Sequence, residues 1–220
     1  MIIAEIGQNF VGDIGLAEHL ISEAYRGGAD LAKFQLYDSK KLYGEYQDTE
    51  LTFPQARGLF EYGEKTGIEV FFSVFDVERV KWCEKIGVKR IKVACNQLGN
   101  NPLLEKIGGT GKHVIVSCRV TPPPLHPALR MVSFLYCIPH YPAQYGELLF
   151  DKIGLGSSFH GFSDHTIGLD ASKIALSRGA EIIEKHFAIN HQTGVDAPWS
   201  MTFEELRELA RFSSVVKQVL

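Results

Sequence analysis

Glu181-Ile-Ile-Glu-Lys-His-Phe187 is a short apolar segment that closes on two polar residues spaced two apart, Glu184 and His186. Side chains two positions apart on a β-strand point to the same face of a sheet. Polar groups at the carboxyl ends of buried strands are typical of a parallel sheet that carries its chemistry at one edge. Seven similar runs precede this one: Ile2–Gly7, Ala29–Gln35, Ile68–Val74, Arg90–Cys95, His113–Cys118, Val132–Cys137 and Gly161–His165.

Helical patterns fill most of the intervals between these runs. They cover Asp13–Tyr25, Phe53–Lys65, Val77–Ile86, Pro102–Ile107, Leu169–Ser177 and Thr202–Val219. Strands that alternate with helices predict βα units in a parallel sheet. The connection Thr121–Pro127 is rich in proline, which lacks the N–H group that a helix needs, so we expect an irregular crossover there. We predict a compact, single-domain (β/α)8 TIM barrel over residues 1–220, and polar groups gathered at its mouth predict an enzyme.

The composition narrows the class of partner. Hydrophobic residues make up 45% of the chain, the net charge is −3, and no basic run stands out, which argues against nucleic acid or a membrane surface as a partner. The cysteines Cys83, Cys95, Cys118 and Cys137 form no CxxC pair. Three of them lie in or at the ends of apolar strand runs, as expected of buried free thiols in a reducing compartment. The first residues already form a strand and no apolar run reaches about 18 residues, so we expect a cytoplasmic protein without a signal peptide.

Two histidines end strands that are neighbours in the predicted barrel. His165 and His186 are therefore expected to converge, and two imidazoles with water and substrate oxygens suit Mn²⁺ better than Mg²⁺. The alternative is that one of them only makes a hydrogen bond in the core. Glu184, two residues before His186, is either a base or a buried structural partner, and the structural role is slightly favoured.

Two lysines end inward-facing runs, Lys33 and Lys92. A lysine on a buried strand is costly unless it is paired or solvated, and holding a phosphate or a carboxylate is a natural role for such a pair. A Schiff-base aldolase also uses a strand lysine, so both chemistries remain open. By alternation Lys185 should point outward, to the helices or the surface, while Arg119 is either an anion contact or a solvated loop residue. The loop Pro139–Tyr145 is expected to wall the site, with His140 facing solvent.

Several longer motifs run in order through most of the chain. They are Ile3-Ala-Glu-Ile-Gly-Gln-Asn9, Gly28-Ala-Asp-Leu-Ala-Lys-Phe-Gln35, Phe72-Ser-Val-Phe-Asp76, Tyr141-Pro142, Gly161-Phe-Ser-Asp-His-Thr-Ile-Gly168, Gly179-Ala-Glu-Ile-Ile-Glu-Lys-His-Phe187 and Gly194-Val-Asp196. In this order and spacing they resemble the N-acetylneuraminate (sialic acid) synthase family. That family joins phosphoenolpyruvate to an N-acyl amino sugar and releases phosphate.

The resemblance implies roles for individual residues, carried over position by position. The implied metal ligands, for Mn²⁺ or Mg²⁺, are His165 and His186. The implied phosphoenolpyruvate-binding residues are Lys33, Lys92, Ser117 and Ser163. The implied sugar-contacting and proton-handling residues are Glu5, Gln35, Tyr141 and Asp196. Among all of these, Glu5, Lys92 and Asp196 are expected to be catalytic. The implied reaction forms a C–C bond, with the metal polarising the sugar aldehyde and no Schiff base.

The chain also departs from the family pattern near the expected phosphoenolpyruvate pocket. Cys95 replaces a usual serine, Gln97 replaces an acidic residue common in one branch, and Pro139 replaces a small polar residue. After Ser117, Cys-Arg-Val, which includes Arg119, replaces Thr-Gly-Met. Typical members also have an N-terminal hairpin and a C-terminal antifreeze-like domain that covers the sugar site from a dimer partner. The resemblance covers the catalytic barrel only, and we expect both of these pieces to be lacking here. We therefore expect an open sugar site, and either a homodimer or a partner that supplies a lid.

Three functions remain in competition at this point. The first is a synthase that condenses phosphoenolpyruvate with an N-acetylmannosamine-like amino sugar, so that its partners are small-molecule substrates. The second is a metal-dependent keto-acid lyase, which would use the same lysines and release no phosphate from phosphoenolpyruvate. The third is a non-catalytic or partner-dependent barrel whose phosphoenolpyruvate pocket has degraded.

Overall fold

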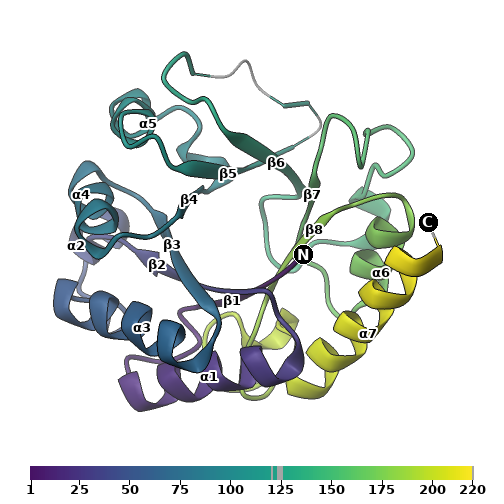
Figure 1. Cartoon of the computed structure of the whole chain (residues 1–220), viewed down its shortest axis with the longest axis horizontal. Helices are drawn as coiled ribbons and strands as arrows, with labels where there is room; N and C mark the ends of the chain where they lie inside the picture. The colour runs from purple at the N-terminus through teal and green to yellow at the C-terminus, as the bar shows by residue number, and fades with distance from the viewer. Residues whose placement is uncertain (120, 123–125, 220) are drawn as a thin grey trace.

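The computed structural model describes residues 1–119, 121–122 and 126–219. Eight parallel strands close into a barrel in chain order, with β8 paired to β1 (Figure 1). They are β1 (Ile2–Gly7), β2 (Leu31–Leu36), β3 (Glu69–Val74), β4 (Arg90–Val93), β5 (His113–Cys118), β6 (Val132–Cys137), β7 (Gly161–Asp164) and β8 (Ile182–His186). The predicted (β/α)8 TIM-barrel fold is confirmed. Several predicted strand boundaries differ from the observed ones by one or two residues. The fourth strand ends at Val93, so that Cys95 begins a 3-10 turn, η1 (Cys95–Gln97), and the seventh ends at Asp164, just before His165.

The α-helices surround the strands and cover the outer face of the barrel (Figure 1). They are α1 (Ile14–Gly27), α2 (Ser39–Tyr43), α3 (Phe53–Thr66), α4 (Val77–Ile86), α5 (Asn101–Gly108), α6 (Asp170–Ser177) and α7 (Phe203–Val219). The predicted helices are all present, and α2 is an additional short helix between β2 and α3. Within the described ranges, no helix combines the length and apolar character needed to cross a membrane.

The β5–β6 connection was predicted to be irregular because of its prolines. The described residues of this connection contain no helix, which agrees with the prediction. Val120 and residues 123–125, which include part of the proline run, lie outside the described residues.

The β6–β7 connection is a long loop that carries the 3-10 turn η2 (Tyr145–Glu147). Aromatic rings cover the barrel here. Phe150 and Phe159 pack edge-on against Tyr136 at centroid distances of 6.0 and 5.8 Å, and Phe162 stacks on it at 5.8 Å. Burying several large rings supplies the apolar contact that a crossover helix gives elsewhere.

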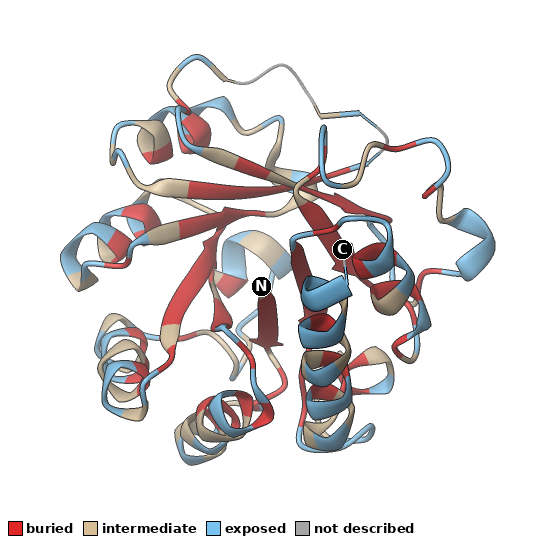
Figure 2. Ribbon diagram, turned by 45° about the vertical axis from the view of Figure 1, so that its right-hand side comes forward, coloured by how far each residue is buried: buried red, intermediate tan, exposed pale blue. Residues whose placement is uncertain are grey.

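The barrel interior has an apolar floor and a polar upper layer. The floor consists of Ile3, Leu31, Phe71, Ile115, Leu135 and Ile182. Two positions further along the same strands come Glu5, Lys33, Ser73, Ser117, Cys137 and Glu184. Because side chains two apart face the same way, these polar groups stand above the floor inside the barrel. A second and larger apolar layer lies between the strands and the helices, and Figure 2 shows the strands buried along most of their length.

Candidate active site

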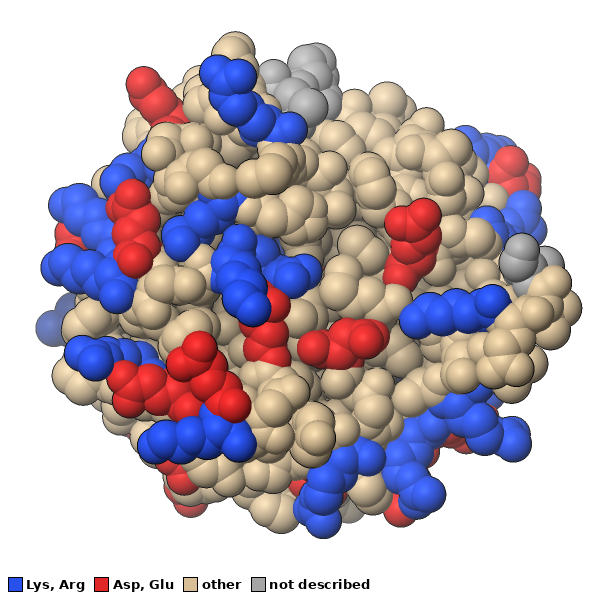
Figure 3. Space-filling view, viewed as in Figure 1, with Lys and Arg blue, Asp and Glu red and all other residues tan. Residues whose placement is uncertain are grey.

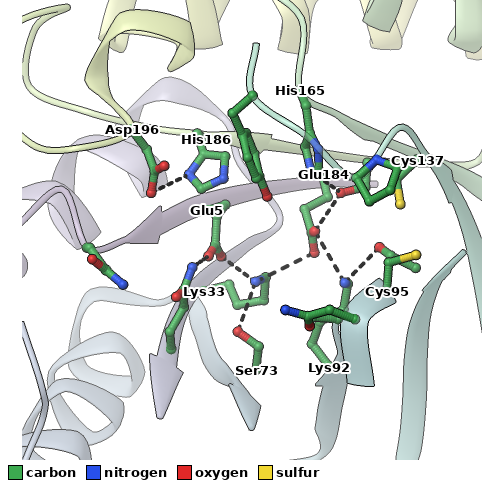
Figure 4. Close-up of a pocket in the computed structure, with 18 of the residues that line it drawn as sticks. Glu5, Lys33, Ser73, Lys92, Cys95, Cys137, His165, Glu184, His186 and Asp196 are labelled. Carbon is green, nitrogen blue, oxygen red and sulfur yellow. Dashed lines mark hydrogen bonds and ion pairs between the residues drawn. The ribbon is translucent and has the colours of Figure 1, made fainter. Parts of the chain in front are cut away.

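A cavity of about 470 Å³ opens at the carboxyl ends of the strands. The site residues predicted from the sequence all line it: Glu5, Lys33, Gln35, Lys92, Ser117, Tyr141, Ser163, His165, His186 and Asp196. They come from β1, β2, β4, β5, β7 and β8 and from the loops that follow β6 and β8. The structure therefore brings the whole predicted set into one pocket, part of which is shown in Figure 4.

Charge on the face shown in Figure 3 does not single out a binding surface. Lysine and arginine are interspersed with acidic side chains over the face shown in Figure 3, in keeping with the net charge of −3. An anionic ligand must therefore be held by individual cations inside the pocket rather than by a broad field.

Lys33 is buried among acceptors. Its Nζ lies 2.5 Å from Glu5 Oε2 and 3.9 Å from Glu184 Oε2, and it donates to Ser73 Oγ at 3.3 Å (Figure 4). Burial alone disfavours the ammonium form. The carboxylates of Glu184 and Glu5 outweigh this, so the pKa of Lys33 is raised above its usual value. The lysine is therefore a fixed positive charge in the pocket.

Lys92 enters the same region from β4. Its Nζ donates to Ser117 Oγ at 2.8 Å and lies 3.5 Å from Glu184 Oε1. The Ser163 hydroxyl also donates to Glu184 Oε1, at 2.9 Å. Burial would raise the pKa of the Glu184 carboxyl, but Lys33 and Lys92 outweigh that effect and lower it to about 2. Glu184 thus carries a negative charge that both lysines share.

Glu184 was left out of the site when the sequence alone was considered. The signal for it was present, since Glu184 stands two before His186 on the same strand and so shares its face. The alternative that it acts as a partner for other groups fits its contacts, because it joins the two lysines and the Ser163 hydroxyl.

The two histidines face each other across the other half of the pocket. The Nδ1 atom of His165 lies 2.6 Å from the Ile138 carbonyl oxygen, which fixes the proton on Nδ1 and makes Nε2, 3.4 Å from the Ser163 hydroxyl oxygen, the atom with the lone pair. Burial lowers the pKa of His165 to about 3, so its ring is neutral. The His186 ring lies 6.2 Å from that of His165, and its Nδ1 is 3.4 Å from Asp196 Oδ2.

Tyr141 packs against both histidines. Its ring stacks on His165 at 4.0 Å and meets His186 edge-on at 5.4 Å. The Trp199 ring also packs against Tyr141, at a centroid distance of 5.5 Å. The aromatic loop after β6 therefore does wall the site, as predicted.

Two imidazoles are the metal-binding groups that this pocket offers. Within the described residues, no group of three or more His, Cys, Asp or Glu side chains is placed to hold an ion. Among the described residues the buried His186 Nδ1 makes no hydrogen bond, although Asp196 Oδ2 lies 3.4 Å away, and a backbone carbonyl fixes the tautomer of the neutral His165 ring. A carbonyl that holds the second nitrogen is the usual support of a ligating histidine. The residues therefore fit an ion held by two imidazoles, with water or ligand oxygens in the remaining positions.

The side of the pocket near β1 is held by amide groups. Gln35 donates to Glu5 Oε1 at 3.0 Å, and Gln8 donates to the hydroxyl of Tyr43 in α2 at 2.9 Å. Fully buried Asn9 accepts from the Asp196 amide at 3.1 Å and donates to the Phe187 carbonyl at 3.0 Å.

Asn9 had no role in the sequence-based prediction, although it lies in the first quoted motif. The structure shows that it holds the loop that carries Asp196 against the end of β8.

The positions that depart from the family pattern divide into two groups. Cys95 and Pro139 line the cavity, whereas Gln97 and Arg119 are not among its lining residues.

Lys185 faces away from the barrel axis as predicted, yet it is not a surface residue. It is buried, and its Nζ lies 3.3 Å from Asp164 Oδ2 and donates to the Thr166 carbonyl at 2.7 Å. An outward-facing lysine can be buried here because the helices cover that face and Asp164 neutralises it. His140 is exposed, as expected, and its Nε2 lies 2.8 Å from Glu147 Oε1.

Comparison with known proteins places this barrel in a family. The NeuB family model matches residues 20–220. An uncharacterized protein from Methanocaldococcus jannaschii is 35% identical over 240 residues, covering 100% of this chain and 71% of that protein. Human N-acetylneuraminate-9-phosphate synthase is 31% identical over 261 residues, covering 100% of this chain and 70% of the human protein.

A solved structure shows the same arrangement. The N-acetylneuraminic acid (sialic acid) synthetase of Leptospira borgpetersenii serovar Hardjo-bovis, crystallised in complex with citrate, superposes with a TM-score of 0.90. It is 28% identical, and the match covers 99% of this chain and 84% of that chain. The motifs that suggested the resemblance are therefore carried by the same fold, and the chain belongs to the NeuB family.

Proposed function

We propose that this protein is a phosphoenolpyruvate-dependent synthase, a transferase that condenses phosphoenolpyruvate with an N-acyl amino sugar to give a sialic-acid-like nonulosonic acid and phosphate. The observation that carries the proposal is the pair of buried lysines that share Glu184 at the centre of the mouth. The names of the relatives support it, because they include N-acetylneuraminate-9-phosphate synthase and, in Campylobacter jejuni, N,N'-diacetyllegionaminic acid synthase.

The lysine side of the pocket suits phosphoenolpyruvate. Lys33 and Lys92 come with the hydroxyls of Ser73, Ser117 and Ser163, and an ammonium with nearby hydroxyls suits both a phosphate and a carboxylate. Before the substrate binds, serine hydroxyls and carboxylates accept the hydrogen bonds that the lysine ammonium groups donate. On binding, the substrate oxygens replace the serine acceptors, and the hydroxyls turn to donate to them.

The same lysines stabilise the charge that develops during the reaction. C3 of phosphoenolpyruvate forms the new bond to the aldehyde carbon of the sugar, and water then adds to C2 and loses a proton. The C–O bond to phosphate breaks last, so negative charge collects on a leaving group beside Lys33 and Lys92. Glu5, which touches Lys33 at 2.5 Å, is assigned to proton transfer at this end of the pocket.

The histidine side of the pocket suits the sugar aldehyde. His165 and His186 would hold a divalent ion, Mn²⁺ or Mg²⁺, which when bound supplies Lewis-acid polarisation of the carbonyl. The Ile138 carbonyl keeps the His165 ring in the ligating tautomer, and Asp196 is placed beside His186 to exchange a proton with the sugar hydroxyls. Gln35 and Tyr141 complete the sugar-contacting set.

The rim of the pocket is open and partly apolar. Tyr43 is 49% exposed, Tyr141 46% and Val195 62%. These residues stand around the proposed sugar side, so a second copy of the chain or another partner that rests on this rim would close the site. We propose such a partner as part of the complete sugar site.

Calorimetric titration of phosphoenolpyruvate into metal-free and Mn²⁺-loaded protein tests the donor site. We expect binding in both states and a loss of at least about tenfold in Lys92→Ala, since a hydrogen bond to a charged group is worth about 1.5–3 kcal/mol. Exposed Lys81→Ala is the matched control and should bind as the parent does. His165→Ala should lose only the metal-dependent part of the binding.

Phosphate release with a panel of N-acyl amino sugars then tests the reaction. Sugar-dependent phosphate release is expected from the parent and not from Lys92→Ala. A keto-acid lyase would turn over a keto acid without releasing phosphate from phosphoenolpyruvate. Unchanged turnover and stability in Lys92→Ala would remove the synthase assignment.

A further inference from the structure

Two cysteines line the phosphoenolpyruvate half of the pocket, and the proposed reaction uses neither. Cys95 opens the turn η1 after β4, and Cys137 ends β6. Both residues line the same cavity, and Figure 4 shows their sulfur atoms on the same side of the pocket, near Lys92. Both are free thiols, Cys137 buried and Cys95 partly accessible from the cavity.

The fold explains how these cysteines meet although β5 lies between their strands. Neighbouring strands are roughly 4.8 Å apart, so the backbones of β4 and β6 are too distant for direct pairing of side chains within the sheet. Cys95, however, lies beyond the end of β4, and η1 packs against β5. The turn thus carries Cys95 over the end of β5 toward Cys137.

The other two cysteines are arranged differently. Cys83 lies in α4 and Cys118 follows Ser117 on β5, so its side chain faces the helices. Both are fully buried in the apolar layer outside the barrel, and neither lines the cavity. The chain therefore supplies one thiol pair at the pocket together with two internal controls.

We propose that Cys95 and Cys137 form an oxidation-sensitive dithiol, which a peroxide converts reversibly into a disulfide that disables the phosphoenolpyruvate pocket. The effect on the pocket rests on the function proposed above, whereas formation of the disulfide does not.

The chemistry assigns different roles to the two sulfurs. The hydrogen bond from Cys137, with Lys92 and Arg119 nearby, lowers the pKa of the Cys95 thiol to about 7, whereas that of Cys137 is raised. The Cys95 thiolate attacks the peroxide, takes one oxygen as sulfenic acid and releases an alcohol or water. The Cys137 thiol then attacks the Cys95 sulfur, which forms the S–S bond and releases water. Two thiols and one peroxide thus give one disulfide, one alcohol or water molecule and one water.

Closure of the disulfide would change the pocket beside Lys92. The bond would draw η1 toward the end of β6 and replace two thiols that face the cavity by a fixed bridge. Lys92 stands on β4, three residues before Cys95, and its 2.8 Å partner Ser117 stands on β5, the strand that the bridge would cross. The bridge would therefore narrow the space that we assign to the anionic end of phosphoenolpyruvate.

The test treats the reduced full-length protein, freed of metal by a chelator, with hydrogen peroxide and then blocks the remaining thiols with a maleimide. Trypsin places each cysteine in a different peptide, so the partner of each can be identified by mass spectrometry. These peptides are Trp82–Lys85, Val93–Lys106, His113–Arg119 and Met131–Lys152. Calorimetric titration of phosphoenolpyruvate is run on the reduced, oxidised and re-reduced samples.

We expect the peptides containing Cys95 and Cys137 to become linked, while Cys83 and Cys118 stay available as thiols once the protein is unfolded. Phosphoenolpyruvate affinity should fall at least about tenfold in the oxidised sample and return with dithiothreitol. Cys95→Ser should form no bridge. In Cys137→Ala, a melting curve first confirms folding, and peroxide should then drive Cys95 to higher acids that dithiothreitol does not reverse.

Other results would overturn parts of the inference. Retention of all thiols, linkage to Cys83 or Cys118, or direct conversion of Cys95 to sulfinic acid in the parent would remove the dithiol. A bridge that leaves phosphoenolpyruvate affinity unchanged would remove its effect on the pocket. A reduced protein that forms the bridge but never binds phosphoenolpyruvate would support the dithiol and count against the proposed function.

Discussion

Glu184 decides the charge of the pocket at the scale of single residues. It touches Lys33 and Lys92 at 3.9 and 3.5 Å and accepts a hydrogen bond from Ser163. A carboxylate between two ammonium groups stabilises the empty site, because an unpaired buried charge is costly. The same carboxylate opposes an incoming anion, so folding and substrate binding make opposite demands on this residue.

Glu184→Gln separates these two demands, since glutamine keeps the size and removes the charge. We expect the free energy of unfolding to fall by about 3 kcal/mol, the cost of breaking a buried ion pair. Phosphoenolpyruvate should bind more tightly, by about tenfold, because the repulsion between Glu184 and the anion is lost. Urea unfolding and calorimetry measure the two effects, with exposed Glu181→Gln on the same segment as control. Weaker binding in Glu184→Gln would show that the carboxylate itself orders the donor site.

Cys95 gives a second prediction at this scale, on pH. Because the thiolate is the nucleophile, iodoacetamide should label Cys95 at a rate that rises with a midpoint near the pKa of about 7. Burial raises the pKa of Cys83 to about 12, so that thiol should stay unlabelled over the same range. Cys137→Ala should move the Cys95 midpoint upward, because the hydrogen bond that stabilises the thiolate is lost. A midpoint unchanged in Cys137→Ala would place the cause in the charges of Lys92 and Arg119.

Strand alternation explains which of these residues were predictable. Lys33 and Ser117 stand two positions beyond Leu31 and Ile115 of the barrel floor, so their direction follows from the period of a strand. The thiol contact of Cys95 was not predictable, because it depends on the turn that η1 makes after β4. The Ile138 carbonyl that fixes His165 has no signal in the sequence, because every residue carries the same backbone carbonyl group.

At the scale of elements, the loop between β8 and α7 carries Asp196 and depends on one close contact. Gly194 has φ +110°, and a Cβ atom placed there would lie 2.5 Å from Asn9 Oδ1 and 2.7 Å from Asn9 Cα. Asn9 in turn holds the Asp196 amide. The close contact between Gly194 and buried Asn9 thus packs the loop after β8 against the segment that follows β1.

Gly194→Ala should disturb this contact, and Gly44→Ala provides a control for the backbone. Gly44 also has a positive φ, +83°, but nothing lies within 4 Å of its Cβ position. Gly44→Ala should cost about 1 kcal/mol for the left-handed conformation. Gly194→Ala should cost more and should also raise the KM for the sugar, because Asn9 and Asp196 must move. Equal losses of stability, with an unchanged KM for the sugar, would mean that the loop does not position Asp196.

The helix α2 is an element that could not be predicted from the sequence pattern. It contains five residues, too few for a hydrophobic period to be recognised. Its stability comes from tertiary contacts: Asp38 caps it by accepting from the Lys41 amide, and Glu50 accepts from the Ser39 amide nearby. Glu50 is itself paired with buried Arg79 of α4 at 3.0 Å. These contacts join segments far apart in the chain, so the pattern of residues 39–43 alone does not show them.

At the scale of the whole molecule, closure of the barrel was predictable from the sequence. The way in which the β6–β7 loop covers the outside of the barrel was not. Eight apolar runs with turns between them are enough to predict a closed parallel barrel. Replacement of a crossover helix by aromatic packing around Tyr136 was not, because Phe150 and Phe159 lie in a loop without strand or helix period. The positions of Phe150 and Phe159 depend on tertiary packing, which the local sequence pattern does not show.

Closure itself depends on the fit of β7 against β8 at Gly161. A Cβ atom on Gly161 would lie 2.0 Å from the Ile182 carbonyl oxygen, and a backbone atom of a paired strand cannot move aside without breaking the ladder. Gly161 does not have a positive φ, so any loss in Gly161→Ala is steric.

We expect Gly161→Ala to lower the free energy of unfolding by several kcal/mol, at the upper end of the usual range for single substitutions. Gly58→Ala, on the exposed face of α3 with nothing within 4 Å of its Cβ position, should instead stabilise the protein by up to about 1 kcal/mol through helix propensity. Urea denaturation followed by circular dichroism measures both. Ser163 lies on β7 and His165 directly follows that strand, while Glu184 and His186 lie on β8. A displaced ladder should therefore weaken metal and phosphoenolpyruvate binding together. If Gly161→Ala were as stable as the parent, β7 and β8 would have to pair in another register, and the geometry of the whole pocket would change with them.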